Sequence, residues 1–146
     1  VTDRPVDPLF AHHPERDQYF STAIIDHLAR SNSRKDVVIG ITALDLYIPI
    51  LTFVFGEAQL GGNCAVGSYH RLAQEFYGLP ADPSLLRDRL VKEAIHEVGH
   101  TTGLTHCDDY ECVMAAAHSV EWLDLKGTAL CSECRAKAGG RVKDER

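Results

Sequence analysis

Three histidines in this sequence have a spacing that can hold a metal ion. They are His96, His100 and His106, in the string H-E-x-x-H-x-x-G-x-x-H. Residues four apart on a helix face the same side with Cβ atoms about 5–6 Å apart, so His96 and His100 can share one ion. Gly103 lets the chain leave the helix with positive φ and carry His106 back to that ion. Three neutral imidazoles leave a tetrahedral zinc one open position, as catalytic zinc sites require.

Glu97 directly follows the first of these histidines and is the candidate general base. Its position beside His96 allows its carboxylate to reach a water at the metal without being a ligand itself. Zinc lowers the pKa of a bound water toward about 7 and polarises a carbonyl. Glu97 would take the proton of that water during attack and pass it to the leaving amine. The alternative is a coincidental helical histidine pair, which the third histidine and the glycine disfavour.

Four cysteines form a second candidate metal site. They are Cys107, Cys112, Cys131 and Cys134, with spacings of x4, x18 and x2 that are close to those of structural zinc sites with four thiolates. The alternative is disulfides or free buried thiols, which a reducing compartment disfavours. Because Cys107 is peptide-bonded to His106, a clamped thiolate would also fix the third histidine. The remaining cysteine, Cys64, is interpreted as a small buried apolar residue.

The extended string H-C-x4-C-x-M…C-x-x-C resembles the archaemetzincin family of zinc metallopeptidases. The resemblance runs from about residue 16 to residue 134. Beyond the metal motifs it includes 16–19 (R-D-Q-Y), 45–47 (D-L-Y), 53–62 (F-V-F-G-E-A-Q-L-G-G) and 75–80 (E-F-Y-G-L-P). The resemblance implies that Met114 forms a Met-turn, a buried methionine beneath the metal site. The alternative for Met114 is an ordinary core residue, and neither interpretation makes it a ligand.

The hydrophobic pattern predicts the elements that must position these residues. Helical spacing predicts a helix over 15–30, and β-branched and aromatic runs predict strands over 37–42, 50–55 and 64–69. A second helix, with Asp82 as N-cap and Pro83 at its first position, is predicted to run to about residue 102. Its predicted inward-facing residues are Leu86, Leu90, Ala94, Ile95 and Val98. Beyond residue 103 we expect little regular structure, apart from a short helix after Cys131.

The expected fold is α+β and metzincin-like. A twisted mixed β-sheet packs against two main helices, one of which carries the HExxH motif. An irregular C-terminal part follows, which a structural zinc would hold together. We expect one metallopeptidase domain over 1–146, with sheet and helices to about 103. The part from about 104 to 146 would hold the third ligand, the Met-turn and the four-cysteine site.

Several groups near the metal motif have two interpretations. Residues 66–69 or 55–59 are candidates for an exposed edge strand, on which a peptide substrate could align by β-augmentation. The alternative is a strand protected within the sheet. His118 and Tyr110 are candidate donors to the oxyanion, and otherwise have structural roles.

Composition limits the remaining function classes. The chain has 146 residues and a formal net charge of −6. This negative charge argues against sequence-independent binding of nucleic acid, which needs clustered lysine and arginine. No apolar run approaches the roughly 18 residues of a membrane span. The charged start of the sequence does not resemble a signal peptide, so we expect a cytoplasmic protein, with a monomer favoured.

The predicted activity is zinc-dependent hydrolysis of peptide or protein substrates, with about two zinc ions per chain. One alternative is a zinc-binding module with little or no proteolytic activity. A second is a zinc endoribonuclease of the ribosomal-RNA-maturation type, because those enzymes use H-x3-H-x5-H, which this chain also satisfies.

Overall fold

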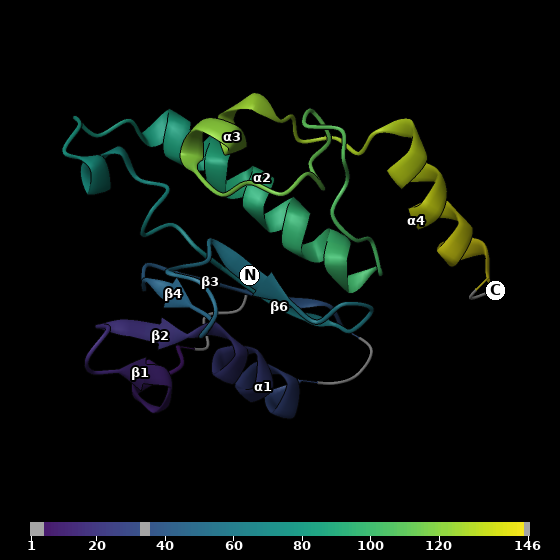
Figure 1. The fold of residues 1–146 in the computed structure, drawn as a ribbon. Coiled ribbons are helices and arrows are strands. Elements are labelled where there is room, and N and C mark those ends of the chain that lie inside the picture. The colour runs from purple at the N-terminus through teal and green to yellow at the C-terminus, as the bar shows by residue number, and fades with distance from the viewer. Residues whose placement is uncertain (1–4, 33–35, 145–146) are drawn as a thin grey trace.

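The helices and strands of this protein form stacked layers. The computed structural model describes residues 5–32 and 36–144, with side chains up to residue 139. The strands are β1 (His12–His13), β2 (Gln18–Phe20), β3 (Val38–Thr42), β4 (Leu46–Tyr47), β5 (Gly56–Ala58) and β6 (Cys64–Ser68). The α-helices are α1 (Ser21–Ser31), α2 (Pro83–Thr101), α3 (Val120–Leu125) and α4 (Ser132–Asp144), and short 3-10 helices span Pro8–Ala11 and Gln74–Tyr77. Helices α1 and α2 lie on opposite sides of the strands, and α3 and α4 lie beyond α2 (Figure 1).

The strands form two small mixed sheets rather than the single sheet that was predicted. One has the order β1-β2-β4 and the other the order β3-β6-β5, and an isolated bridge between Leu46 and Val54 lies outside both. Strand β6 is parallel to β3 and antiparallel to β5. All five residues of β6 are buried, because both α1 and α2 pack against it. A strand covered on both faces is typically apolar throughout.

Helix α2 begins and ends as the sequence predicted. The side chain of Asp82 accepts a hydrogen bond from the backbone N–H of Leu85, and Pro83 occupies the first turn. Gly103 adopts a φ of 97°, which lets the chain turn away after the last helical residue.

The most buried stripe of α2 is polar, which the apolar pattern did not predict. The five predicted inward-facing residues are half-buried, and three of them, Leu86, Leu90 and Ile95, pack against core clusters as predicted. The buried positions follow helical spacing and are Arg89, Lys92, Glu93, His96, Glu97 and Thr101. Such a stripe is tolerated because its members find partners. Arg89, for example, donates two hydrogen bonds to Asp124 of α3, at 2.8 Å each.

Helix α1 begins six residues later than predicted. Residues 14–17 form a turn in which Asp17 has a φ of 48°, and Gln18–Phe20 then form strand β2. The helix therefore starts at Ser21, and its buried Ile25 packs against Leu46 and the β6 residue Cys64.

The predicted strand over 50–55 is wrong. Ile50 is 86% exposed, and within 50–55 the β-bridge of Val54 with Leu46 is an isolated one that belongs to neither sheet. The carbonyl of Thr52 instead accepts hydrogen bonds from the side chains of Arg16 and Gln18. Side-chain donors thus take the place of backbone hydrogen bonds from a neighbouring strand, and regular strand pairing begins only at β5.

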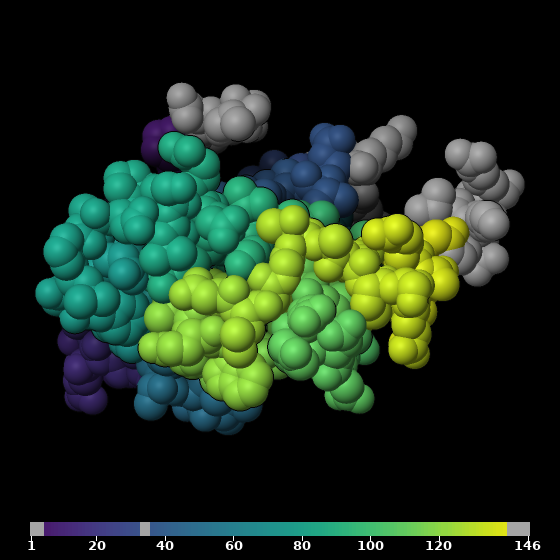
Figure 2. All heavy atoms as spheres, turned by 90° about the horizontal axis from the view of Figure 1, so that it is seen from above, coloured from purple at the N-terminus to yellow at the C-terminus, as the bar shows by residue number. Residues whose placement is uncertain are grey.

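The C-terminal part contains more helix than expected. Helix α3 was not predicted; the side chain of Ser119 caps it by accepting from the N–H of Trp122. Leu123 of α3 is fully buried in a cluster with Phe55 and Leu72. The chain from about residue 104 onward, green to yellow, lies outermost when the molecule is viewed from above (Figure 2). None of the helices within the described ranges is long and apolar enough to span a bilayer.

Candidate metal centre in an open cleft

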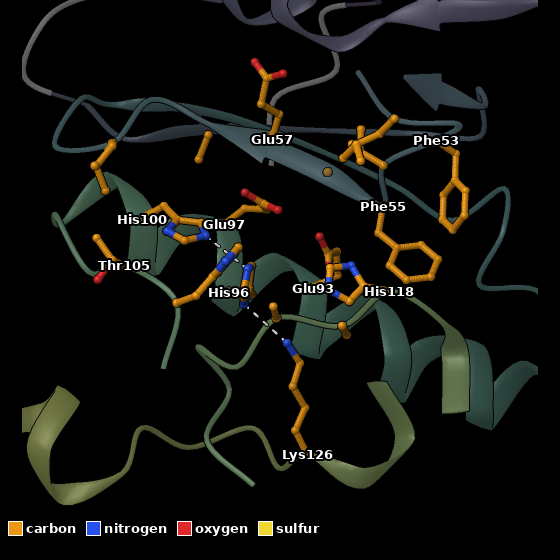
Figure 3. A pocket seen from close by; sticks show the side chains of 18 of the residues that line it. Phe53, Phe55, Glu57, Glu93, His96, Glu97, His100, Thr105, His118 and Lys126 are labelled. Carbon is orange, nitrogen blue, oxygen red and sulfur yellow. Dashed lines mark hydrogen bonds between the residues drawn. The ribbon is translucent and has the colours of Figure 1, made fainter. Parts of the chain in front are cut away.

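A cleft of about 600 Å³ is lined by β5 and by the polar stripe of α2. Residues 51–58 and Leu60 line one wall, and residues of α2 together with 105–106 and 116–118 line the other. His96, Glu97 and His100 project into it from α2 (Figure 3). The described residues leave this space open, so the chain does not block its own cleft.

The three predicted histidines converge at one end of the cleft. One ring nitrogen from each of His96, His100 and His106 lies within 4.8 Å of the others. Nδ1 of His96 donates to the carbonyl of Val113 at 2.8 Å, and Nδ1 of His100 donates to that of Leu104 at 2.7 Å. With their protons on Nδ1, both rings present a bare Nε2, and the two Nε2 atoms are 3.0 Å apart. Two lone pairs at this distance repel each other unless a cation lies between them, so the arrangement fits a shared metal ion.

The surroundings of His96 and His106 lower the pKa of both imidazoles, which favours the neutral form that a metal ligand needs. Burial, and then the charge of Lys126, lowers the pKa of His96 to about 3. Burial is also the main reason why the pKa of His106 lies below its usual value.

Glu97 lies beside the histidines with one oxygen free. It is 4% exposed, and its Oε2 is buried without a hydrogen-bond partner among the described residues. Burial raises its pKa well above 4.5, and the charge and hydrogen bond of the neighbouring carboxyl Glu93 raise it further. A buried, unpaired carboxylate oxygen is costly, and a water or a metal ion at this place would relieve that cost.

Strand β5 approaches these two carboxyl groups closely. A Cβ on Gly56 would lie 2.9 Å from Oε1 of Glu93 and 3.0 Å from Oε1 of Glu97. The glycine therefore allows the strand backbone to pack directly against the pair.

Two charged residues of the site were missed by the sequence reasoning. Glu93 precedes Glu97 by one helical turn, so its position on the same face was a usable signal. Lys126 has no such signal, because it lies between α3 and α4 and only the fold brings it under the histidines. Its Nζ donates to the carbonyls of Val113 and Ala115, at 2.9 and 2.8 Å. The Val113 carbonyl therefore accepts from both Lys126 and His96.

Met114 lies in the turn beneath the histidines, as the family resemblance implied. It is fully buried, and its carbonyl accepts a hydrogen bond from the N–H of Cys107 at 3.0 Å. That bond joins the turn to the first residue of the four-cysteine cluster.

The four predicted cysteines converge in the C-terminal part, with their sulfur atoms within 4.8 Å of one another. Sγ of Cys107 is 3.7 Å from Sγ of Cys131, far beyond the roughly 2.05 Å of a disulfide. It is close to the edge of a tetrahedron with Zn–S bonds of about 2.3 Å, which is about 3.8 Å. The backbone N–H of Cys134 donates to Sγ of Cys131, and this bond lowers the pKa of Cys131 to about 7. The geometry fits a metal held by four thiolates.

The structure distinguishes between the remaining candidates from the sequence. His118 lines the cleft, whereas Tyr110 is not part of its lining and is exposed. Of the two candidate edge strands, β5 is the outer strand and faces the cleft, while β6 is enclosed between β3 and β5. Cys64 is buried, as predicted.

The charges around the cleft are mostly acidic. Among the described lining residues, Glu57, Glu93 and Glu97 oppose a single lysine or arginine, the buried Lys126. The basic surface that a nuclease needs around its metal is therefore missing from this lining.

Comparisons with known proteins agree with this arrangement. A model of peptidase family M54 matches residues 11–139. An archaemetzincin of Methanocaldococcus jannaschii is 43% identical over 134 residues, which cover 92% of this chain and 73% of that protein. The crystal structure of an archaemetzincin from Methanopyrus kandleri superposes with a TM-score of 0.85 at 40% identity, covering 94% of this chain and 73% of that one. A zinc-dependent peptidase from Methanocorpusculum labreanum gives a TM-score of 0.84 at 34% identity, covering 94% of this chain and 83% of that one.

Proposed function

The chain belongs to peptidase family M54, the archaemetzincins, and is therefore a zinc metallopeptidase; on that premise we propose that it cleaves peptide bonds with Glu97 as the general base. The observation that carries this proposal is the unpartnered Oε2 of Glu97, buried beside three converging imidazoles. A general base needs such a free acceptor atom within reach of the water that it activates.

We assign the ligands and their supports by residue. His96, His100 and His106 would hold a catalytic zinc, which when bound would polarise the scissile carbonyl and acidify a water. The carbonyls of Val113 and Leu104 orient two of these imidazoles. Cys107, Cys112, Cys131 and Cys134 would hold a second, structural zinc, making about two ions per chain.

In the proposed reaction, the substrate backbone lies along the outer strand β5. Glu97 accepts a proton from the attacking water through Oε2 and later delivers it to the leaving amine. Burial raises the pKa of Glu97, which suits delivery of the proton, and a bound dication would lower that pKa, which suits acceptance of the proton. Between the two candidate oxyanion donors we favour His118, because it lines the cleft and Tyr110 does not.

Other aspects of the function are inferred from charge and thiol chemistry. The acidic net charge of −6 and the acidic cleft support a protein substrate without a nucleic-acid partner. No disulfide joins the described cysteines, and thiolate ligands for zinc persist in a reducing compartment such as the cytoplasm. A single domain over 1–146 and a monomeric state remain predictions.

The test pairs metal content with cleavage. Zinc content and cleavage of a peptide library are measured for the parent and for Glu97→Gln, which keeps the size of the side chain but cannot accept the proton. We expect equal zinc content and a loss of rate on the order of 10²–10⁴-fold. A variant as active as the parent would rule out Glu97 as the base. A zinc-loaded parent that cleaves nothing would instead favour the binding module.

A further inference from the structure

A second carboxyl group lies beside the proposed general base. Glu93 precedes Glu97 by one turn of α2, is 4% exposed and forms a hydrogen bond with it. Figure 3 shows both side chains on the side of α2 that faces β5. Glutamate is rarely buried this deeply unless it has a partner, and the proposed reaction gives Glu93 no task. What Glu93 contributes therefore has to be found in its contact with Glu97.

The neighbouring sheet leaves room for this second carboxyl group. Gly56 and Gly67 lie opposite each other in the ladder between β5 and β6, so neither strand carries a side chain at that point. A Cβ on Gly56 would lie 2.9 Å from Oε1 of Glu93, and a Cβ on Gly67 would lie 3.9 Å from its Cγ. Two facing glycines thus make space for the Glu93 side chain between α2 and the sheet.

The third glutamate of the described cleft lining belongs to a different contact. Glu57 directly follows Gly56, so its side chain points to the opposite face of β5, as Figure 3 shows. There its Oε1 accepts hydrogen bonds from the hydroxyl groups of Ser21 and Thr22, at 2.9 and 2.8 Å. Glu93 is therefore the lining glutamate that supports Glu97.

The contact makes the two oxygens of Glu97 unequal. Oε2 has no partner among the described residues, so the hydrogen bond with Glu93 is made through Oε1. Two ionised carboxylates side by side repel each other, so this bond requires a proton on one of the groups. Burial raises the pKa of Glu93, which favours the protonated form that can donate. Oε1 is then occupied, and Oε2 is the oxygen left for a water.

We propose that Glu93 is a positioning residue for proton transfer by Glu97: it donates to Oε1 and so fixes the carboxyl group with Oε2 directed at the water. This inference rests on the proposed peptidase function. Oε2 accepts one proton from the water and returns it to the leaving amine, while the proton of the hydrogen bond stays with Glu93. Because Glu93 acts only through Glu97, its effect falls on the chemical step and not on substrate binding.

Two substitutions at position 93 separate hydrogen bonding from volume. Glu93→Gln keeps an N–H that can donate to Oε1 of Glu97, whereas Glu93→Leu fills similar space without a donor. In cleavage of one peptide, Glu93→Leu should lower kcat about 10–100-fold with little change in KM, as loss of a supporting partner typically does. Glu93→Gln should retain most of the kcat of the parent. The control is Glu121→Leu on the exposed side of α3, outside the cleft lining, which should leave both constants unchanged.

A double-mutant cycle tests whether Glu93 acts through Glu97. In the Glu97→Gln background, which lacks the base, adding Glu93→Leu should lower the residual kcat no further. Zinc content should be equal in all variants, and a thermal melt checks their fold. An equal loss of kcat in both backgrounds would show a purely structural role and overturn the proposal. A Glu93→Gln protein as impaired as Glu93→Leu would overturn it too.

Infrared spectroscopy tests the hydrogen bond without turnover, which separates this inference from the proposed function. Exposed carboxyl groups are ionised at pH 7, so the carbonyl stretch of a protonated carboxyl group identifies a buried one. The zinc-loaded parent should show this band, and Glu93→Gln should lack it. That result supports the bond between the two groups even if the parent cleaves no peptide. A parent without the band, or a band that persists in Glu93→Gln, overturns the proposal.

Discussion

The side chain of Met114 packs directly against the backbone of Gly99 in α2. A Cβ at position 99 would overlap the Met114 sulfur and crowd its Cε at 3.1 Å. Glycine inside a helix costs about 1 kcal/mol relative to alanine, so this position favours close packing over helix propensity. Gly99 lies one residue before His100, and Met114 one residue after Val113, whose carbonyl orients His96. The contact therefore couples the turn to two of the predicted ligands.

We expect Gly99→Ala to lower the free energy of unfolding by about 1–3 kcal/mol, because an added methyl group overpacks the contact with Met114. It should also weaken metal binding at the histidines, measured by competition with a coloured chelator. The control is Gly139→Ala in α4, where nothing lies within 4 Å of the added Cβ. That control should be neutral or slightly stabilising. A Gly99→Ala protein as stable as the parent would contradict the role of this contact.

Lys126→Met should weaken metal binding at the histidines by about 10–100-fold. The change removes the donor that holds the Val113 and Ala115 carbonyls, and with it the support of the turn that orients His96. The matched control is Lys92→Met. Lys92 is also buried, but its Nζ lies 3.4 Å from the carbonyl of Leu123 in α3.

Both lysine variants should lose stability, and only Lys126→Met should change the metal affinity. Isothermal titration with zinc, together with urea unfolding of the same samples, measures both quantities. Tighter zinc binding by Lys126→Met would show that repulsion between ammonium and metal outweighs the support of the turn.

The two candidate metal sites should differ in how readily they lose zinc. The histidine site has three protein ligands and an open position that admits a chelator, whereas four thiolates enclose the other ion. Elemental analysis should find about two zinc ions per chain, and a limited amount of chelator should remove one. Cys131→Ser should lower the melting temperature far more than Glu97→Ala, because the thiolate-bound metal is a cross-link of the fold. One metal per chain together with two disulfides would contradict this prediction.

The ion pair between Asp45 and Arg71 should make stability depend on acid. Burial raises the pKa of Asp45, but hydrogen bonds from Arg71 and Gln18 and the charge of Arg71 outweigh it, so the pKa falls below 3.8. A carboxyl whose pKa is lower in the folded state stabilises the fold above its unfolded pKa, and this contribution disappears as pH falls through the folded value. Asp45→Asn should therefore cost about 2 kcal/mol at pH 7 and much less near pH 2.

Urea unfolding of the parent and of Asp45→Asn at both pH values measures this difference. Asp26→Asn on the exposed side of α1 is the control, and its cost should be small at either pH. An equal cost of Asp45→Asn at both pH values would rule out the ion pair as the source of the acid dependence.

The sequence alone was sufficient for features that depend on residues close together in the chain. His96 and His100 share a helix face, and Gly103 turns the chain so that His106 can return. Helical geometry and one permissive glycine determine that convergence. The N-cap at Asp82 follows the same local logic. Cys107 and Cys131 are farther apart in the chain. The cysteine motif nevertheless indicated that they converge, because the spacing of thiolate ligands in zinc sites is restricted.

The tertiary structure decided what depends on distant partners. The apolar run over 50–55 is not a strand, because Arg16 and Gln18 satisfy its carbonyls from another part of the chain. Lys126 reaches His96 only because α3 packs across α2, and no periodicity in the sequence encodes that contact. Ala117 packs against the cluster that contains Phe55 for the same reason. Hydrophobic periodicity reports which side of an element is apolar, whereas the partner of each side is set by the packing of the whole chain.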